Sequence, residues 1–95
     1  MTVPPLIFRV RAIRRMFQRG ISTDDVRSVL ESGRMIEEYP DDHPCPSRLV
    51  LGWSGSRPIH VVASDNLNTH ETIVITVYEP DPVKWEAGFS RRRKT

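Results

Sequence analysis

The sequence predicts a single α+β domain, with two N-terminal helices on one face of an antiparallel sheet of three to four strands. Apolar residues recur at helical spacing over residues 8–30, whereas residues 34–79 hold short apolar runs broken by turn residues. Helices followed by strands, without alternation, are typical of the α+β class. Ninety-five residues suit one domain, so we expect residues 1–95 to fold as a unit.

The first helix is predicted over residues 8–19, after an extended segment over residues 1–7 that contains Pro4 and Pro5. Gly20 follows this helix and suits a helix C-terminus. An apolar stripe at helical spacing should pack the helix on the sheet, and its members are Val10, Ile13, Met16 and Phe17.

A second helix is predicted to begin after Ser22, whose hydroxyl can cap it, and to end at Gly33. Asp24 and Asp25 lie in its first turn, where carboxylates favour the positive end of the helix dipole. The apolar stripe of this helix consists of Val26, Val29 and Leu30.

Four segments are predicted as strands from their apolar pattern, namely 34–39, 48–53, 57–63 and 72–79. Residues 40–47 are rich in proline and cannot continue a ladder, so we expect a loop there. A hairpin with residues 54–56 at its turn would place Leu51 opposite Ile59, which keeps apolar residues on one face.

This register gives the predicted sheet two unlike faces. The helices should cover the face that carries Ile73, Ile75 and Val77. The opposite face would present Arg48, His60, Thr76 and Tyr78. Residues 87–95 would follow as a basic tail, and the edge strand 34–39 could pair two chains in a homodimer.

The composition argues against several classes of protein. No apolar stretch approaches the ~20 residues that cross a bilayer, and the N-terminus lacks the charged start and cleavage site of a signal peptide. A single cysteine, Cys45, excludes a disulfide framework, so we expect a cytoplasmic protein. Zinc-ligand spacing and cofactor motifs are both missing, so we expect neither a metal nor a cofactor.

Charge is segregated along the chain. Residues 1–34 carry a net charge of +4, residues 35–82 carry −6, and residues 83–95 carry +4, for a total of +2. The basic ends would suit RNA or an acidic protein partner, or they would form a solvated surface that balances the acidic middle.

His60 is the candidate for chemistry on the second sheet face. Imidazole exchanges protons near pH 7, and Tyr78 would lie close to it. Metal-independent RNA cleavage needs a base, an acid and a cation for the phosphate, which histidine, tyrosine and arginine supply. The alternative is a half-buried structural histidine that is bonded to Thr76.

The chain contains, in order, RMFQRGISTDDV, IEEYPDDHPCPSRLVLG, RPIHVV and IVITVYEPDPVKWEAGFSRRR. Together these segments resemble the bacterial domain of unknown function 4258 family, over about residues 8–93. The architecture of that family is similar to RelE-like or barnase-like ribonucleases. Toxins of the RelE-like group act on RNA without a metal and are silenced by an antitoxin protein.

The resemblance implies a site made of catalytic and phosphate-binding residues. The catalytic residues would be His60, Tyr78 and Arg91. Among the candidates for binding RNA phosphates, Arg92 likewise matches a terminal arginine of the family, whereas Arg11, Arg15 and Arg48 are candidates because they lie on the basic first helix and on the second sheet face.

One position departs from the resemblance. Family members begin the first helix with H-A-x-x-R-M, and here Arg11 stands at the place of the histidine. Arginine stays protonated at neutral pH and cannot act as a base. Two functions therefore stay open, a ribonuclease of a toxin–antitoxin system and a non-catalytic module that binds protein or RNA.

Overall fold

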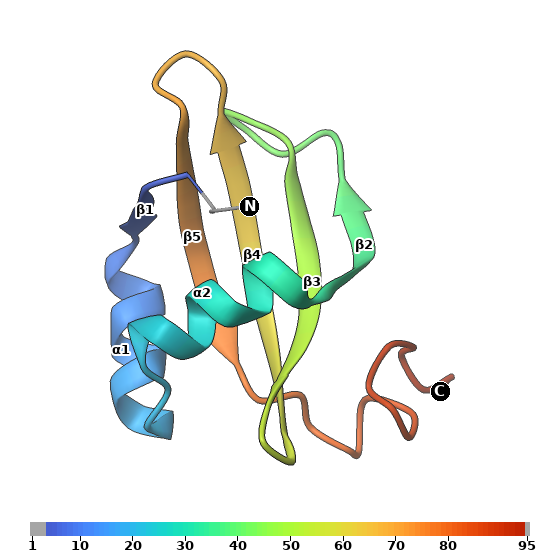
Figure 1. Cartoon of the computed structure of the whole chain (residues 1–95). Coiled ribbons are helices and arrows are strands. Elements are labelled where there is room, and N and C mark those ends of the chain that lie inside the picture. Colours follow the sequence, from blue (N-terminus) through green and yellow to red (C-terminus); the bar gives the residue numbers. More distant parts are fainter. Residues whose placement is uncertain (1–3, 95) are drawn as a thin grey trace.

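The structure is a computed structural model that describes residues 4–94, so residues 1–3 of the predicted extended segment lie outside the described part. Two helices and five strands follow one another as β1-α1-α2-β2-β3-β4-β5 (Figure 1). The helices are α1 (Val10–Arg19) and α2 (Thr23–Ser32). The strands are β1 (Leu6–Phe8), β2 (Arg34–Tyr39), β3 (Ser47–Ser54), β4 (Arg57–Asn66) and β5 (Glu71–Tyr78).

The strands form one mixed sheet in the spatial order β1-β5-β4-β3-β2. The α+β class and the two helices are confirmed, and the predicted antiparallel sheet of three to four strands is matched in part, because a fifth strand makes the sheet mixed. Leu6 lies opposite Thr72, and the short strand β1 runs parallel to β5, while all other neighbours are antiparallel. A three-residue strand is too short to show an alternating pattern, so the sequence carried no signal for it.

Helix α1 packs on the sheet through Ala12 and Met16, which are both buried. The predicted stripe is therefore correct only for Met16, because Val10, Ile13 and Phe17 are exposed at 64%, 53% and 89%. The spacing identified an apolar stripe, but α1 faces β5 with only Ala12 and Met16. The small side chain of Ala12 lets the helix lie close to the strand.

Helix α2 begins as predicted. The Ser22 hydroxyl accepts a hydrogen bond from the Asp25 N–H, and the Asp25 carboxylate accepts one from the Ser22 N–H, both at 3.0 Å. The backbone N–H of Ser22 lowers the pKa of Asp25. Val26 and Val29 are buried in the core, and Val29 lies so close to β3 that a Cβ on Gly52 would meet its side chain at 2.7 Å. Glycine at position 52 therefore permits the helix to lie directly on the strand.

The hairpin between β3 and β4 has a shorter turn than predicted. Ser54 lies opposite Arg57, which leaves two turn residues, and Gly55 adopts φ 61°, a conformation that glycine takes without strain. Leu51 is consequently opposite His60, and the predicted pairing with Ile59 is wrong. A slip of one residue reverses the faces, so Leu51 moves to the side of His60.

The ladder between β4 and β5 contains a bulge. Val62 pairs with Thr76 and Ala63 pairs with Val74, so Ile75 is an extra residue in β5. The core residues of β5 are Val74 and Val77, and the prediction that Ile73 and Ile75 face the helices is wrong. The bulge also places Tyr78 directly opposite His60.

The chain does not leave the sheet as a free basic tail. After β5 it turns back on itself over residues 84–93, here called the C-terminal turn (Figure 1). Trp85 bridges to Arg92, and the Arg93 N–H donates to the Lys84 carbonyl at 2.8 Å. Trp85 is buried at 3% exposure against His60, and the segment predicted as a basic tail, residues 87–95, contacts the domain through Phe89 and Arg92.

Strand β2 lies at the edge of the sheet, as expected of residues 34–39. Its ladder with β3 is interrupted between Met35 and Glu37, and bulges of this kind weaken an edge as a template for a second chain. The homodimer stays a prediction. Neither helix in residues 4–94 has the length and apolar character that crossing a membrane requires.

Candidate functional site

A cleft of about 470 Å³ opens between α1, the end of β5 and the C-terminal turn. We call it the basic cleft, because five of its side chains are cationic and two are acidic. Its lining residues are Arg11, Arg15, Arg19, Thr76, Tyr78, Glu79, Asp81, Lys84, Trp85 and Arg92.

One wall of the cleft follows from helical spacing. Arg11, Arg15 and Arg19 are four residues apart, so they lie above one another on one face of α1. The end of this helix is attached to the sheet by Arg57, whose guanidinium donates to the Arg19 carbonyl at 2.5 Å and to the Glu79 carboxylate at 2.6 Å. This ion pair also offsets the negative charge of Glu79, which is one of the two acidic residues of the cleft.

His60 lies behind the cleft and is fully buried. Its Nε2 is 2.8 Å from the Phe89 carbonyl oxygen, which can only accept, so Nε2 carries the proton. Nδ1 then accepts from the Tyr78 hydroxyl at 3.3 Å. Burial lowers the pKa of His60, which favours this neutral tautomer. The expected alternative, a half-buried histidine bonded to Thr76, is wrong, because Tyr78 and Phe89 occupy both ring nitrogens.

Tyr78 connects this buried histidine to the cleft. The residue is half-buried and lines the cleft, while its ring meets the His60 ring edge-on at 5.2 Å between centroids. Burial raises the pKa of Tyr78, so the phenol stays protonated and can donate its hydrogen bond to Nδ1. The predicted proximity of His60 and Tyr78 is confirmed.

Arg92 is held in place by two partners, Trp85 and Glu37. Its guanidinium lies 4.6 Å from the centre of the Trp85 ring and donates to both carboxylate oxygens of Glu37, at 3.0 and 3.2 Å. This hydrogen bond lowers the pKa of Glu37. The Tyr39 hydroxyl also donates a hydrogen bond to Glu37 at 2.6 Å. The pKa of Tyr39 is raised to about 12, mainly by burial.

The predicted site residues are only partly brought together. Arg11, Arg15, Tyr78 and Arg92 line the basic cleft, and the histidine lies directly behind it. Arg91 is exposed and is not among the residues that line the cleft.

Arg48 lies away from the cleft. It pairs with Ala63, a core residue under the helices, and its guanidinium forms an ion pair with Asp65 at 2.8 Å. The prediction that Arg48 shares a face with His60 is wrong, because the hairpin register differs from the expected one by one residue.

Several residues in or beside the cleft were not singled out from the sequence. Arg19 continues the spacing of Arg11 and Arg15, so the helical pattern could have identified it. Glu37 bonds to Arg92, which is 55 residues away in the sequence, and Phe89 bonds to His60, which is 29 residues away. No local sequence pattern indicates contacts over such separations.

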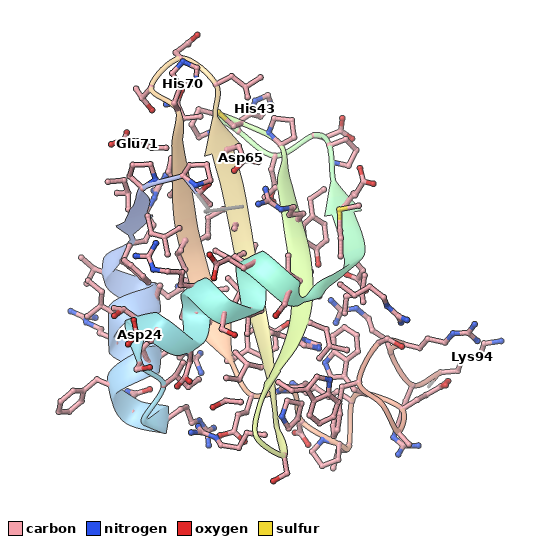
Figure 2. The ribbon with its side chains drawn as sticks, in the orientation of Figure 1. Asp24, His43, Asp65, His70, Glu71 and Lys94 are labelled. Carbon is pink, nitrogen blue, oxygen red and sulfur yellow. The ribbon has the colours of Figure 1, made fainter. Side chains whose placement is uncertain are left out.

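The other histidines do not contribute to the site. Figure 2 shows His43 and His70 at the end of the sheet away from Lys94. Within residues 4–94, no group of three or more histidine, cysteine, aspartate or glutamate side chains is placed to hold a metal ion.

Comparison with known proteins identifies the family of the chain. The family profile described as domain of unknown function DUF4258 matches residues 9–79. The chain belongs to the DUF4258 family. No curated protein and no solved structure matches the chain. The DUF4258 match includes His60 and Tyr78 but ends before the C-terminal turn, so Trp85 and Arg92 lie outside it.

Proposed function

We propose that the chain is a metal-independent ribonuclease of the toxin type, similar to RelE-like enzymes, that holds RNA in the basic cleft. One observation carries the proposal. Tyr78 lines a cleft with five cationic side chains, and its hydroxyl donates to the buried His60. A cleft of this charge raises the local concentration of a polyanion, and arginine matches the geometry of phosphate. An antitoxin protein is the partner that this class implies.

The proton transfer runs through the tyrosine. A ribose 2′-hydroxyl gives its proton to the Tyr78 oxygen while the phenolic proton passes to Nδ1 of His60. The 2′ oxygen attacks the adjacent phosphorus, the bond from phosphorus to the 5′ oxygen breaks, and a 2′,3′-cyclic phosphate forms. The proton returns from His60 through Tyr78 to the departing 5′ oxygen, so both residues end in their starting states.

The arginines stabilise the charge that develops on phosphorus. Arg11 and Arg15 extend from α1, and Arg92 is fixed by Glu37 and Trp85, so the phosphate meets cations from two walls of the cleft. Cations held in place before the reaction cost no rearrangement when the transition state forms.

A second function, a non-catalytic RNA-binding module, is favoured by a different observation. His60 is fully buried with both ring nitrogens bonded, and Arg11 stands where the family resemblance has a histidine. Such a module would use the same cations for binding and would leave the RNA intact.

The deciding experiment measures cleavage and binding of a labelled single-stranded RNA by the purified protein in excess chelator. We expect cleavage by the wild-type chain. Tyr78→Phe should lower kcat about 100-fold with little change in binding, since proton transfer contributes on that order. An RNA with one 2′-deoxyribose should bind and resist cleavage at that position.

The binding arm needs a matched pair of variants. Arg15→Ala removes a cleft cation, whereas Arg27→Ala removes an exposed cation from α2. Only Arg15→Ala should weaken RNA binding and reduce its dependence on salt. Binding without cleavage would establish the module, and equal RNA binding by both variants would exclude the cleft from either function.

A further inference from the structure

The outer surface of α1 carries an apolar stripe that the fold does not use. Val10, Ile13 and Phe17 are spaced by three and four residues, so they lie on one side of the helix. Phe17 is 89% exposed, and the core face of α1 is supplied by Ala12 and Met16 instead. Single exposed apolar side chains are ordinary, but three in a row on one helix are typical of a binding surface.

The charge around this stripe has one sign. Helix α1 contains four arginines and no acidic residue, and Arg9 precedes it. Arg14 lies one turn from Val10 and three residues before Phe17, so its guanidinium borders the stripe. A partner that covers these apolar side chains therefore meets positive charge at its rim.

We propose that the stripe Val10, Ile13 and Phe17 docks an acidic amphipathic helix of a partner protein. Helices of this kind place apolar side chains at positions i, i+3, i+4 and i+7, and the stripe has the same spacing at i, i+3 and i+7. Glutamates beside them would face Arg14 and Arg9, and complementary charge of this type speeds association and selects the partner. The proposal does not depend on any activity toward RNA.

Two other occupants fit the surface less well. A second copy would have to offer an acidic apolar helix, but the apolar residues Val26 and Val29 of α2 are already buried in the core. Membrane binding by an amphipathic helix strengthens with the apolar area that the helix buries in the lipid. Helix α1 has ten residues and would insert only three apolar side chains into an anionic membrane, so stable binding is not expected.

The test uses two synthetic 15-residue peptides with leucines at positions i, i+3, i+4 and i+7, one with glutamates and one with lysines at the remaining positions. Fluorescence anisotropy measures their binding to the full chain. We expect binding of the glutamate peptide at least tenfold tighter than of the lysine peptide. Phe17→Asp should weaken it at least tenfold.

Leu67→Asp is the matched control, because Leu67 is an equally exposed apolar residue at 80% and lies outside α1. This variant should bind the glutamate peptide within twofold of wild type, and Phe17→Asp should keep wild-type RNA binding and thermal stability. Equal binding of both peptides, or equal loss in both variants, would overturn the proposal. So would self-association in sedimentation, or binding to phosphatidylserine vesicles, that Phe17→Asp abolishes.

Discussion

At the scale of single residues, the site depends on groups that neutralise or orient one another. His60 is restricted to one tautomer by the Phe89 carbonyl, and this tautomer makes Tyr78 a donor. Arg92 is oriented by Glu37 and Trp85 although half of its side chain is exposed. The sequence indicated His60 and Tyr78, but it contained no sign of the Phe89 carbonyl that sets the tautomer of His60 or of the Glu37 carboxylate that orients Arg92.

Two neighbouring arginines provide a test at this scale. Arg92→Ala should lower the free energy of unfolding by about 1 kcal/mol, because it removes a cation–π contact and a partly exposed ion pair. Arg91→Ala should change it by less than about 0.5 kcal/mol, since the Arg91 side chain is exposed. Urea denaturation measures both values. Equal losses would show that Arg92 does not hold the C-terminal turn against the sheet.

At the scale of elements, three features place the two helices. The capping box begins α2, Gly52 lets it lie on β3, and Arg57 ties the end of α1 to β5 through Glu79. The cap could be predicted because its partners are three residues apart. The other two contacts join distant parts of the chain, so only the folded structure reveals them.

Gly52→Ala tests the contact between α2 and β3. The added methyl group would overlap the Val29 side chain, so the variant should lose about 1 to 3 kcal/mol in the free energy of unfolding. Ser56→Ala, at an exposed turn position of the same hairpin, is the control and should be nearly neutral. Thermal and urea unfolding measure the difference, and a neutral Gly52→Ala would mean that the helix can shift without cost.

At the scale of the whole molecule, the sheet separates two environments. One face packs against α1 and α2 and is apolar, with Val61, Val74 and Val77 fully buried. The other face holds the titratable network of His60, Tyr78 and their partners beneath the C-terminal turn. Protonation of that network is therefore linked to the stability of the whole fold.

Stability should depend on pH with a plateau between about pH 6.5 and 10. The folded-state pKa of His60 lies below its ordinary value of 6.5, so the unfolded chain binds the proton first and stability falls as the pH drops below 6.5. The folded-state pKa values of Tyr78 and Tyr39 lie above 10, and that of Tyr39 is about 12, so stability falls again as the pH rises above 10.

Chemical denaturation at a series of pH values measures this profile. One proton contributes at most about 1.4 kcal/mol per pH unit. His60→Gln keeps a donor for the Phe89 carbonyl but cannot titrate, so it should remove the loss between pH 6.5 and 5. A wild-type profile that is flat in this range would contradict the assigned burial of His60.

The sequence by itself determined the α+β class, the two helices, the cap at Ser22 and the position of four strands. These features depend on residues close together in the chain, where spacing and propensity decide the structure. Only the tertiary structure decided the pairing of Leu51, the exposure of Phe17, the place of Arg48 and the burial of His60. A two-residue turn and a bulge shift side chains between faces, because strand register has a period of two. The C-terminal turn buries His60 through contacts that join distant parts of the chain.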